Sequence, residues 1–326
     1  EGQRKGNLGE ENQLSFDKLA FSGLAKTYNV DAQTPDSAGT MTAMMSGVKT
    51  DVGVIGVNEN IERGDCSTVA GNELITALEL AEIAGKSTGI ISTARDLTAE
   101  WQEKYTNGVF LMDETGFNGI NTETTERVFG LFNESHMQYE ADRKNDVAGE
   151  PSVSQMTKKA IQILDNNDDG YFLMVESGRI DHGHHAGSAY NALTDTIEFA
   201  NAVQSAIDNT DPSETLILVT ADHGHVFTIA GYPKRGNPIL GKVVNVGEEM
   251  PALAADDMPY TTLGYTNGLG FRNLGSETDA DEAYNLEIAA GRQDLADIDT
   301  TTSGYHQEAL VPFSSETHSG EDVGVY

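Results

Sequence analysis

Residues 170–185 read GYFLMVESGRIDHGHH, and two different patterns follow each other in this sixteen-residue stretch. Its first half is short, apolar on both faces and ends in polar residues, as a central strand of a mostly parallel sheet does. Its second half gathers ionisable side chains that are costly to bury unless they are paired or bound to metal. We therefore expect a buried strand that ends at a functional site, whose ionisable residues are Glu176, Arg179, Asp181, His182, His184 and His185.

Two further stretches repeat the strand pattern, TGIIST (88–93) and TLILVTADH (215–223). Helical patterns at 73–86, 152–167 and 189–209 each precede one of the strands. Alternation of strands and helices predicts an α/β fold, with a doubly wound, mostly parallel central sheet flanked by helices. In such a fold, ligands bind at the carboxyl ends of the strands.

The composition bounds the kind of site. A chain of 326 residues is long enough for one large α/β domain or two smaller ones. Acidic residues number 52 against 20 lysines and arginines, which gives a net charge of −32, and they are spread along the chain. This excludes a nucleic-acid-binding module, because phosphate backbones require a basic surface. The acidic coat indicates a halophilic surface that stays hydrated in high salt, and an ordinary acidic protein is the alternative.

Cysteine usage and apolar runs exclude other classes. Cys66 is the single cysteine, so it cannot form an internal disulfide or a thiolate metal cluster, and we expect an inert core or loop residue. No apolar run approaches the roughly 20 residues needed to span a bilayer. No signal peptide is visible, but the chain begins at Glu1 without an initiator methionine, which is compatible with a removed export signal.

Candidate metal ligands lie at two predicted strand ends. Glu176 ends one strand and Asp181 and His185 follow it, whereas Asp222 and His223 end another. Oxygen and imidazole donors without cysteine suit a hydrolytic zinc site, and a carboxylate-rich neighbour suits magnesium. Whether the remaining histidines bind metal, support the ligands or lie at the surface is left open by their spacing; these are His182, His184 and His225.

A third feature is the stretch TPDSAGTMTAMMSGVKT (34–50). Methionines and Val48 recur at helical spacing after Ser37, which puts Ser37 at a helix N-terminus, where free N–H groups and the dipole favour an anion. The alternative is that Asp36 or Ser37 is only the helix cap. Close to zinc, the hydroxyl would lose its proton and become a nucleophile.

The segments TPDSAGT, VESGRIDHGHH, TADHGHVFTIAGY and ETHSGEDVGV occur in this order, and together they resemble the alkaline phosphatase family. The resemblance covers most of the chain and is strongest to the branch that includes the shrimp and mammalian enzymes and some marine or halophilic bacterial ones. It implies a phosphomonoesterase that works at alkaline pH through a phosphoserine intermediate. It also implies two zinc ions, one magnesium ion, a homodimer and a periplasmic or secreted location.

The resemblance further implies a role for each matching residue. Ser37 would be the nucleophile. The first zinc, which holds the water of the second step, would be bound by Asp181, His185 and His318. The second zinc, which activates the serine, would be bound by Asp222, His223 and Ser37. Magnesium would be bound by Glu176, and the ligands would be supported from outside by Asp36, His182 and His225.

The net negative charge opposes an anionic substrate at long range. Three divalent ions would act on the phosphate from a few ångströms, whereas the acidic coat acts from farther away and is screened by salt. We therefore expect the local attraction to exceed the repulsion.

The chain departs from the family pattern at three places. It begins downstream of an Asp-Gly-Met-Gly turn whose Asp bridges zinc and magnesium. After STAR (92–95) it runs into DLTAEWQEK (96–104), without the family's Thr-His-Ala-Thr-Pro-like stretch and phosphate-clamping arginine, and it stops at Tyr326 in an expected strand. We expect these segments to be unobserved rather than deleted, because losing a core strand and the clamp should abolish fold and activity.

The expected domains follow from the same resemblance. Residues 1–235 and 317–326 would form the α/β metallohydrolase core, and 236–316 a crown-like insertion at the dimer interface. His306 in the insertion is interpreted as a surface or interface residue. Residues 133–151 correspond to a region that binds a calcium-like ion in some relatives; Glu150 is the best-matched ligand, and no site is assigned there.

Two other functions remain as alternatives. A phosphodiesterase or sulfatase of the same superfamily typically has a threonine or a modified cysteine or serine as nucleophile and lacks the HGHH and THSGEDV contexts. A non-catalytic acidic metal-binding protein would bind zinc and turn over nothing. The phosphomonoesterase is the predicted function.

Overall fold

The computed structural model describes residues 1–93, 105, 107–275 and 288–326. At its centre lie two parallel strands in continuous register, β2 (Ser87–Ser92) and β5 (Tyr171–Glu176). They are the strands predicted at 88–93 and 170–177. Both run toward the same end of the molecule, so the polar residues that follow them share one edge.

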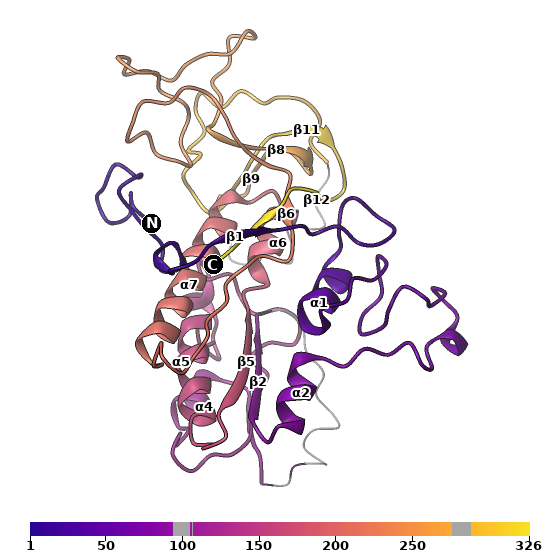
Figure 1. Ribbon diagram of the computed structural model, residues 1–326. Coiled ribbons are helices and arrows are strands. Elements are labelled where there is room, and N and C mark those ends of the chain that lie inside the picture. The colour runs from indigo at the N-terminus through magenta and orange to yellow at the C-terminus, as the bar shows by residue number, and fades with distance from the viewer. Residues whose placement is uncertain (94–104, 106, 276–287) are drawn as a thin grey trace.

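Helices cover both sides of this pair. In Figure 1, α5 (Val153–Leu164) and α7 (Ala189–Asp208) lie on one side, and α2 (Ala77–Ile83) lies on the other. The three predicted helices are therefore confirmed, and so is the α/β class. The helix predicted at 73–86 is shorter at its start because Thr76 is its N-cap rather than an interior residue.

Local sequence signals explain where these helices begin. Thr76 and Ser152 each form a capping box, with Glu79 and Gln155 respectively, so that free N–H groups at the helix starts are satisfied. Ser188 caps α7 by accepting a hydrogen bond from the backbone N–H of Asn191. The core between the helices and strands includes Ile91, Leu111, Phe117, Met137, Val153, Met156 and Ala202.

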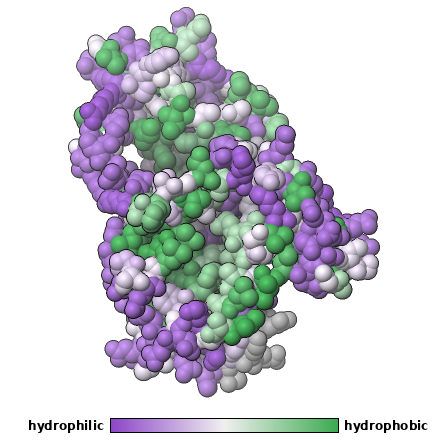
Figure 2. Space-filling view, viewed as in Figure 1, coloured by the Kyte–Doolittle hydropathy of each residue, from purple (hydrophilic) through white to green (hydrophobic). Residues whose placement is uncertain are grey.

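The stretch 215–223 was predicted as a central strand, and the structure contradicts this. Residues 215–219 form no strand ladder, and Thr220 makes only an isolated bridge to Val325. Leu216 and Leu218, which would share one face of a strand, are 81% and 69% exposed, whereas Val219 on the other face is buried, so the segment is not buried on both faces as a central strand is. A continuous ladder needs hydrogen-bonded neighbours, and within the described residues this segment has only the chain end. In the view of Figure 2, which is that of Figure 1, apolar residues are exposed across the middle of the molecule.

The other described strands form small sheets instead of one continuous sheet. Parallel pairing recurs twice, and the remaining pairs are antiparallel. The parallel pairs are β3 (Val109–Leu111) with β4 (Val128–Gly130), and β8 (Leu263–Gly268) with β11 (Ala309–Pro312). The antiparallel pairs are β1 (Gly23–Ala25) with β13 (Val323–Val325), β6 (Gly224–His225) with β12 (His318–Ser319), β7 (Phe227–Ile229) with β8, and β9 (Arg272–Asn273) with β10 (Tyr305–His306). The remaining described helical elements are η1 (Phe16–Lys18), α1 (Ser37–Ser46), η2 (Cys66–Thr68), α4 (Glu114–Asn118), η3 (Arg143–Asn145) and α6 (Arg179–His185).

The region 236–316 lies above the central strands in Figure 1. It is joined to the start of α7 by Gln307, whose backbone N–H donates to the Gly187 carbonyl at 2.9 Å and whose side chain accepts from the Ala189 N–H at 2.8 Å. His306 is 1% exposed, and its Nδ1 lies 2.7 Å from the Ala186 carbonyl. The interpretation of His306 as a surface or interface residue is therefore wrong, because its side chain is buried within the chain and hydrogen-bonded there.

Candidate active site

The first turn of α1 (Ser37–Ser46) presents the predicted nucleophile. Asp36 is the N-cap, and its Oδ1 accepts from the Gly39 N–H at 3.2 Å. The Asn29 side chain makes two hydrogen bonds to Asp36: its Oδ1 accepts from the Asp36 backbone N–H at 3.1 Å, and its Nδ2 donates to Asp36 Oδ1 at 2.8 Å. Because Asp36 makes the cap, the Ser37 hydroxyl is left for another contact, and its Oγ lies 3.0 Å from His223 Nε2.

The helix α6 (Arg179–His185) follows β5 almost directly and carries Asp181 and His185. A glycine lets it pack closely on α7: a Cβ at Gly183 would lie 2.7 Å from the backbone nitrogen of Ala192. The two donors, four residues apart, therefore lie on one face above the carboxyl end of the strand, as predicted.

The pairing of β6 with β12 brings in the remaining histidines. His225 and His318 are directly opposed in this antiparallel pair, although 93 positions separate them in the sequence. The ring of His318 also stacks on that of His223, with centroids 3.6 Å apart. Residues from four separate stretches of chain thus meet at one place.

Asp181, His185 and His318 have the spacing of a zinc-binding set. Asp181 Oδ1 lies 3.3 Å from His185 Nε2 and 3.4 Å from His318 Nε2, and the two ring nitrogens are 3.1 Å apart. Donors at zinc bond lengths of about 2.0–2.1 Å in a tetrahedron lie roughly 3.3–3.4 Å from one another. The three separations match that arrangement, so the residues present fit the metal that the sequence predicts.

Hydrogen bonds on the far side of each ring fix its lone pair. His318 Nδ1 lies 2.9 Å from the Pro35 carbonyl, and His185 Nδ1 lies 2.7 Å from the Glu316 carbonyl. Because a carbonyl only accepts, each Nδ1 carries the proton and the neutral ring has its lone pair on Nε2. Two lone pairs and a carboxylate oxygen facing one another repel unless a cation lies between them.

The electrostatics of Asp181 and its neighbours are consistent with a cation. Asp181 Oδ1 is buried, and no N–H of the described residues is aligned to donate to it. Burial raises the pKa of Asp181, but contacts with His225 and His318 and the nearby imidazole charge hold it well below the usual range. Burial opposes the charged form of His225, whereas Asp181 and Glu316 raise its pKa to about 9. A metal ion binding here would compete with protons for these groups.

Ser37, His223 and Asp222 form a second group beside the first. His223 Nε2 lies 3.2 Å from Asp222 Oδ2 as well as 3.0 Å from Ser37 Oγ. His223 is 5% exposed, and Asp222 Oδ2 is also 3.4 Å from the Thr40 hydroxyl. The structure therefore brings together all three residues predicted for the second zinc.

Glu176 lies at the same edge but outside the imidazole groups. Its Oε2 accepts a hydrogen bond from the Ser92 hydroxyl at 2.5 Å. Burial raises the pKa of Glu176, the Ser92 hydrogen bond opposes this, and the charges of Asp222 and Asp181 raise it further. Among the described residues, Glu176 belongs to no cluster of three His, Cys, Asp or Glu side chains. The Ser92 hydroxyl is therefore the neighbouring oxygen that could bind the predicted magnesium ion together with Glu176.

The histidines left open by their spacing separate in the structure. His225 lies between two carboxylates, with Nε2 3.0 Å from Asp181 Oδ1 and Nδ1 2.8 Å from Glu316 Oε2. His182 lies away from them, with Nδ1 3.0 Å from Arg179 Nη1, and burial beside this guanidinium lowers its pKa to about 4. His184 Nδ1 is 2.9 Å from the Tyr265 hydroxyl, and burial lowers its pKa to about 3.

Two participants were not singled out from the sequence, Glu316 and Tyr265. Glu316 stands in the ETHSG motif, two residues before His318, and this position was the available signal. Tyr265 lies on β8 in a region of weak periodicity, which gave none. Glu150, the uncommitted ion ligand, is 1% exposed, and its carboxylate accepts from Asn133 Nδ2 and the Gln138 N–H.

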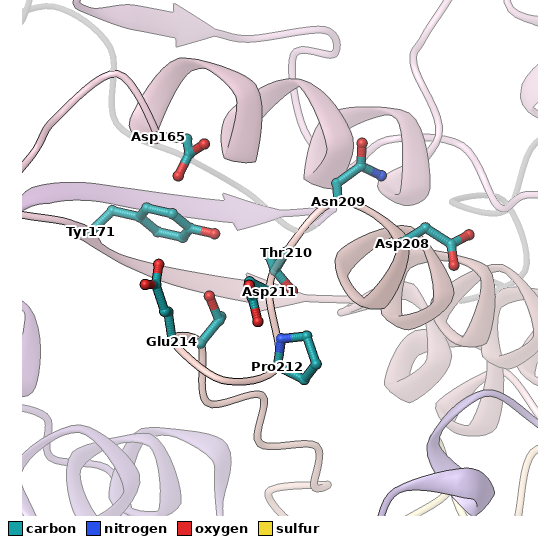
Figure 3. A pocket seen from close by; sticks show the side chains of 9 residues that line it. Asp165, Tyr171, Asp208, Asn209, Thr210, Asp211, Pro212 and Glu214 are labelled. Atoms are coloured by element: carbon teal, nitrogen blue, oxygen red, sulfur yellow. The ribbon is translucent and has the colours of Figure 1, made fainter.

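A cavity of about 610 Å³ lies at the opposite end of β5. Figure 3 shows Asp165, Asp211 and Glu214 around the ring of Tyr171. No histidine, lysine or arginine is among its lining residues. An acidic cavity repels phosphate, so this cavity is not the place for the predicted substrate.

Comparison with known proteins identifies the relatives of this chain. The sequence profile described as alkaline phosphatase matches residues 1–96 and 94–326. The tissue-nonspecific alkaline phosphatase isozyme of Homo sapiens is 33% identical over 410 aligned residues, which cover 100% of this chain and 74% of that protein. The alkaline phosphatase of Gadus morhua is 30% identical over 409 residues, covering 100% and 81%. Because both alignments are longer than this chain, the relatives have residues in the matched range without a counterpart here.

Solved structures agree on the fold. The alkaline phosphatase of Thermus thermophilus superposes with a TM-score of 0.63 and 18% identity, covering 97% of this chain and 80% of that one. The enzyme from the Antarctic bacterium TAB5 gives a TM-score of 0.55 and 17% identity, covering 98% and 85%. No helix of the described residues is long and apolar enough to cross a membrane. The predicted departure after Arg95 lies outside the described residues, and the two parts of the profile match meet at that point.

Proposed function

The chain belongs to the alkaline phosphatase family and is a phosphomonoesterase, and we propose that it works through a phosphoserine intermediate on Ser37. The observation that carries this proposal is the contact of Ser37 Oγ with His223 Nε2 at 3.0 Å, beside the groups around Asp181. Ser37 also begins a capped helix, whose N-terminal N–H groups and dipole favour a bound phosphate.

We propose two zinc ions and one magnesium ion as the cofactors. Zinc bound to these donors supplies positive charge to the phosphoryl group and lowers the pKa of a coordinated hydroxyl or water. One zinc would be held by Asp181, His185 and His318, and the other by Asp222, His223 and Ser37. Glu176 would hold magnesium, with the Ser92 hydroxyl as its neighbour.

The two chemical steps balance on the residues of the chain. In the first step, a bond forms between Ser37 Oγ and phosphorus while the bond to the alcohol oxygen breaks; the proton lost by the serine hydroxyl is balanced by the proton that the leaving alcohol takes up. In the second step, water attacks the same phosphorus from the opposite side, the serine oxygen leaves and regains a proton in exchange for the one that the water loses, and inorganic phosphate is released. His185 and His318 keep Nε2 unprotonated for the cation because their Nδ1 protons are held by carbonyl groups.

The wider setting is also part of the proposal. We propose a halophilic homodimer that acts in the periplasm or after secretion, at alkaline pH. Its core would comprise residues 1–235 and 317–326, and the crown-like insertion would comprise 236–316. Burial of His306 and the contacts of Gln307 support close packing of the insertion on α7.

Replacement of Ser37 by alanine tests the nucleophile. We expect Ser37→Ala to lower the turnover of p-nitrophenyl phosphate by on the order of 10³-fold or more, because no bond to phosphorus can form at that position. Zinc content should stay close to wild type, since the other donors remain. Intact-mass measurement after acid quenching with substrate should show an added phosphoryl group in the wild type and none in the variant.

Ser46→Ala is the matched control, because Ser46 ends the same helix and, among the described residues, its hydroxyl bonds the Thr42 carbonyl and the Val48 N–H and no candidate ligand. Its turnover should equal that of the wild type. Wild-type turnover in Ser37→Ala would reduce Ser37 to the first residue of a helix and remove the proposed intermediate.

A further inference from the structure

Glu316 is a buried carboxylate next to the candidate metal ligands. It is 1% exposed and lies between β11 and β12, in the segment that leads to His318. Among the described residues no lysine or arginine forms an ion pair with it; its side-chain neighbours of basic type are the imidazoles of His225 and His185. A buried carboxylate is costly unless hydrogen bonds or opposite charges compensate it, so its contacts define its role.

The two oxygens of this carboxylate have different partners. Oε2 lies 2.8 Å from His225 Nδ1, and Oε1 accepts from the backbone N–H of Val226 at 2.8 Å. The Glu316 carboxylate therefore fixes both the imidazole ring of His225 and the backbone directly after β6. The other nitrogen of the His225 ring faces Asp181 Oδ1 at 3.0 Å. Glu316, His225 and Asp181 thus lie in a row that ends at the candidate metal ligand: a hydrogen bond joins Glu316 to His225, and a close charge contact joins His225 to Asp181.

The main chain of Glu316 acts on a second ligand. Its carbonyl lies 2.7 Å from His185 Nδ1, and its N–H donates to the His185 carbonyl at 3.1 Å. One residue therefore orients His185 directly and Asp181 through His225. These are two of the three residues in the candidate set with His318.

The fold holds Glu316 in this position from β8. Gly268 at the end of β8 has φ +139°, and a Cβ there would lie 3.2 Å from the Cβ of Glu316. The next residue, Thr317, donates its N–H to Asn267 Oδ1 at 3.1 Å, and its hydroxyl accepts from Asn267 Nδ2 at 3.0 Å. The close backbone approach and the paired hydrogen bonds leave little freedom to the segment.

We propose that Glu316 is a positioning residue that aligns Asp181, through His225, and His185, through its carbonyl, to bind a divalent cation. It touches neither the substrate nor the cation. This inference rests on the proposed function, because it assigns the organisation of the same metal site. Outer partners of this kind typically contribute about 10- to 100-fold to metal affinity.

The test is a zinc titration of metal-free protein against a competing chelator, for wild type, Glu316→Gln and Glu308→Gln. Glu316→Gln keeps the shape but loses the charge and one acceptor, so we expect about 10- to 100-fold weaker zinc binding. Glu308→Gln is the matched control, since Glu308 lies in the same region and contacts Arg292 and the Gln293 N–H instead of a ligand. Its zinc affinity should equal that of the wild type.

A spectroscopic readout separates alignment from general loss of stability. With Co²⁺ as the probe, Glu316→Gln should show a changed visible absorption envelope at saturating metal, whereas Glu308→Gln should match the wild type. Equal zinc affinity and equal Co²⁺ spectra in Glu316→Gln and wild type would overturn the proposal. A wild type that binds zinc without hydrolysing p-nitrophenyl phosphate would overturn the proposed function and leave this comparison of affinities valid.

If Glu316→Gln fails to fold, imidazole nitrogen NMR of the zinc-loaded wild type decides the matter. We expect a proton on Nδ1 of both His225 and His185, protected from exchange by Glu316. An unprotonated or freely exchanging Nδ1 on His225 would show that the buried carboxylate does not hold the ring, and would overturn the proposal.

Discussion

The two ends of β5 both carry carboxylates, yet only one has the architecture of an active site. At the carboxyl end, α1 and α6 begin, and Asp181 meets the imidazoles of His185, His225 and His318. At the amino end, α5 and α7 terminate beside the cavity at Tyr171, which has acidic but no imidazole or cationic lining. Helix starts favour anions and helix ends disfavour them, so the direction of the strand sorts the charges.

The difference shows that neither cavity size nor the number of acids defines the site. What distinguishes the carboxyl end is that carbonyl and carboxylate acceptors fix the proton of each ring, so that His185 and His318 present lone pairs to one point. The acids at the amino end are exposed to solvent. The same substitution of a carboxylate by an amide at each end of β5 would compare the contributions of the two ends to activity.

The largest effect is expected from the pair Asp181→Asn and Asp208→Asn. Asp181→Asn removes the charge between the imidazoles, and we expect turnover of p-nitrophenyl phosphate to fall by more than the roughly 10- to 100-fold typical of an outer partner. Asp208→Asn makes the same change at the amino end, and its turnover should equal that of the wild type. Steady-state kinetics with zinc in excess provides the measurement, and equal losses in both variants would erase the distinction between the ends.

An intermediate effect is expected from Asp195, a buried carboxylate of α7. Unlike Asp181, it forms no hydrogen bond or ion pair with an imidazole among the described residues. Burial raises its pKa to about 8, while the Glu140 N–H and Arg179 oppose the shift. Between about pH 4 and pH 8, Asp195 therefore carries a proton in the folded protein, whereas in the unfolded chain it is ionised above its ordinary pKa of 3.8. By linkage, the stability from this group is fully present below that value and is lost as pH rises toward about 8.

Asp195→Asn keeps an acceptor oxygen and cannot ionise, so the variant should not lose stability as the pH rises toward about 8. Relative to wild type, its free energy of unfolding should be higher at about pH 9 than at about pH 5, as urea denaturation would measure. Asp168→Asn, at an exposed position, is the control. A difference between Asp195→Asn and wild type that is independent of pH would show that Asp195 does not titrate in this range.

The smallest effect is expected from relieving repulsion at the amino end. The double variant Asp208→Asn/Glu214→Gln should raise the melting temperature at low salt, because it removes two like charges beside the helix ends. The gain should vanish at about 1 M NaCl, where charges are screened within roughly 3 Å. Thermal melts of both proteins across a salt series would check this, and a gain independent of salt would point to a cause other than charge.

The sequence predicted the carboxyl end better than the sheet. The central strands, the helices and the position of Ser37 depend on local periodicity and capping, and the structure confirms them. The stretch 215–223 has the same local apolarity as β5, but a strand also needs hydrogen-bonded neighbours, which apolarity does not specify. Polar residues in a region of weak periodicity are hard to place, which explains the wrong interpretation of His306.

Roles that depend on pairing between distant residues were also beyond local reasoning. Glu316 acquires its contacts only when β12 lies beside β6, and Tyr265 only when β8 lies against His184. The ligands themselves could be nominated because each follows a strand or a motif. Which nitrogen each ring presents could not, because the acceptor that fixes it comes from another part of the chain.

The pairing of His225 with His318 also has a consequence for how the protein folds. Pro35, His185, His225 and His318 come together from positions up to 283 residues apart, so the loops that join them must close before any ligand set exists. Contacts of such high sequence separation form slowly, after local helices and hairpins. Uptake of the proposed metal is therefore expected late, once residue 318 has docked, and metal retention would serve as a kinetic marker of completed folding.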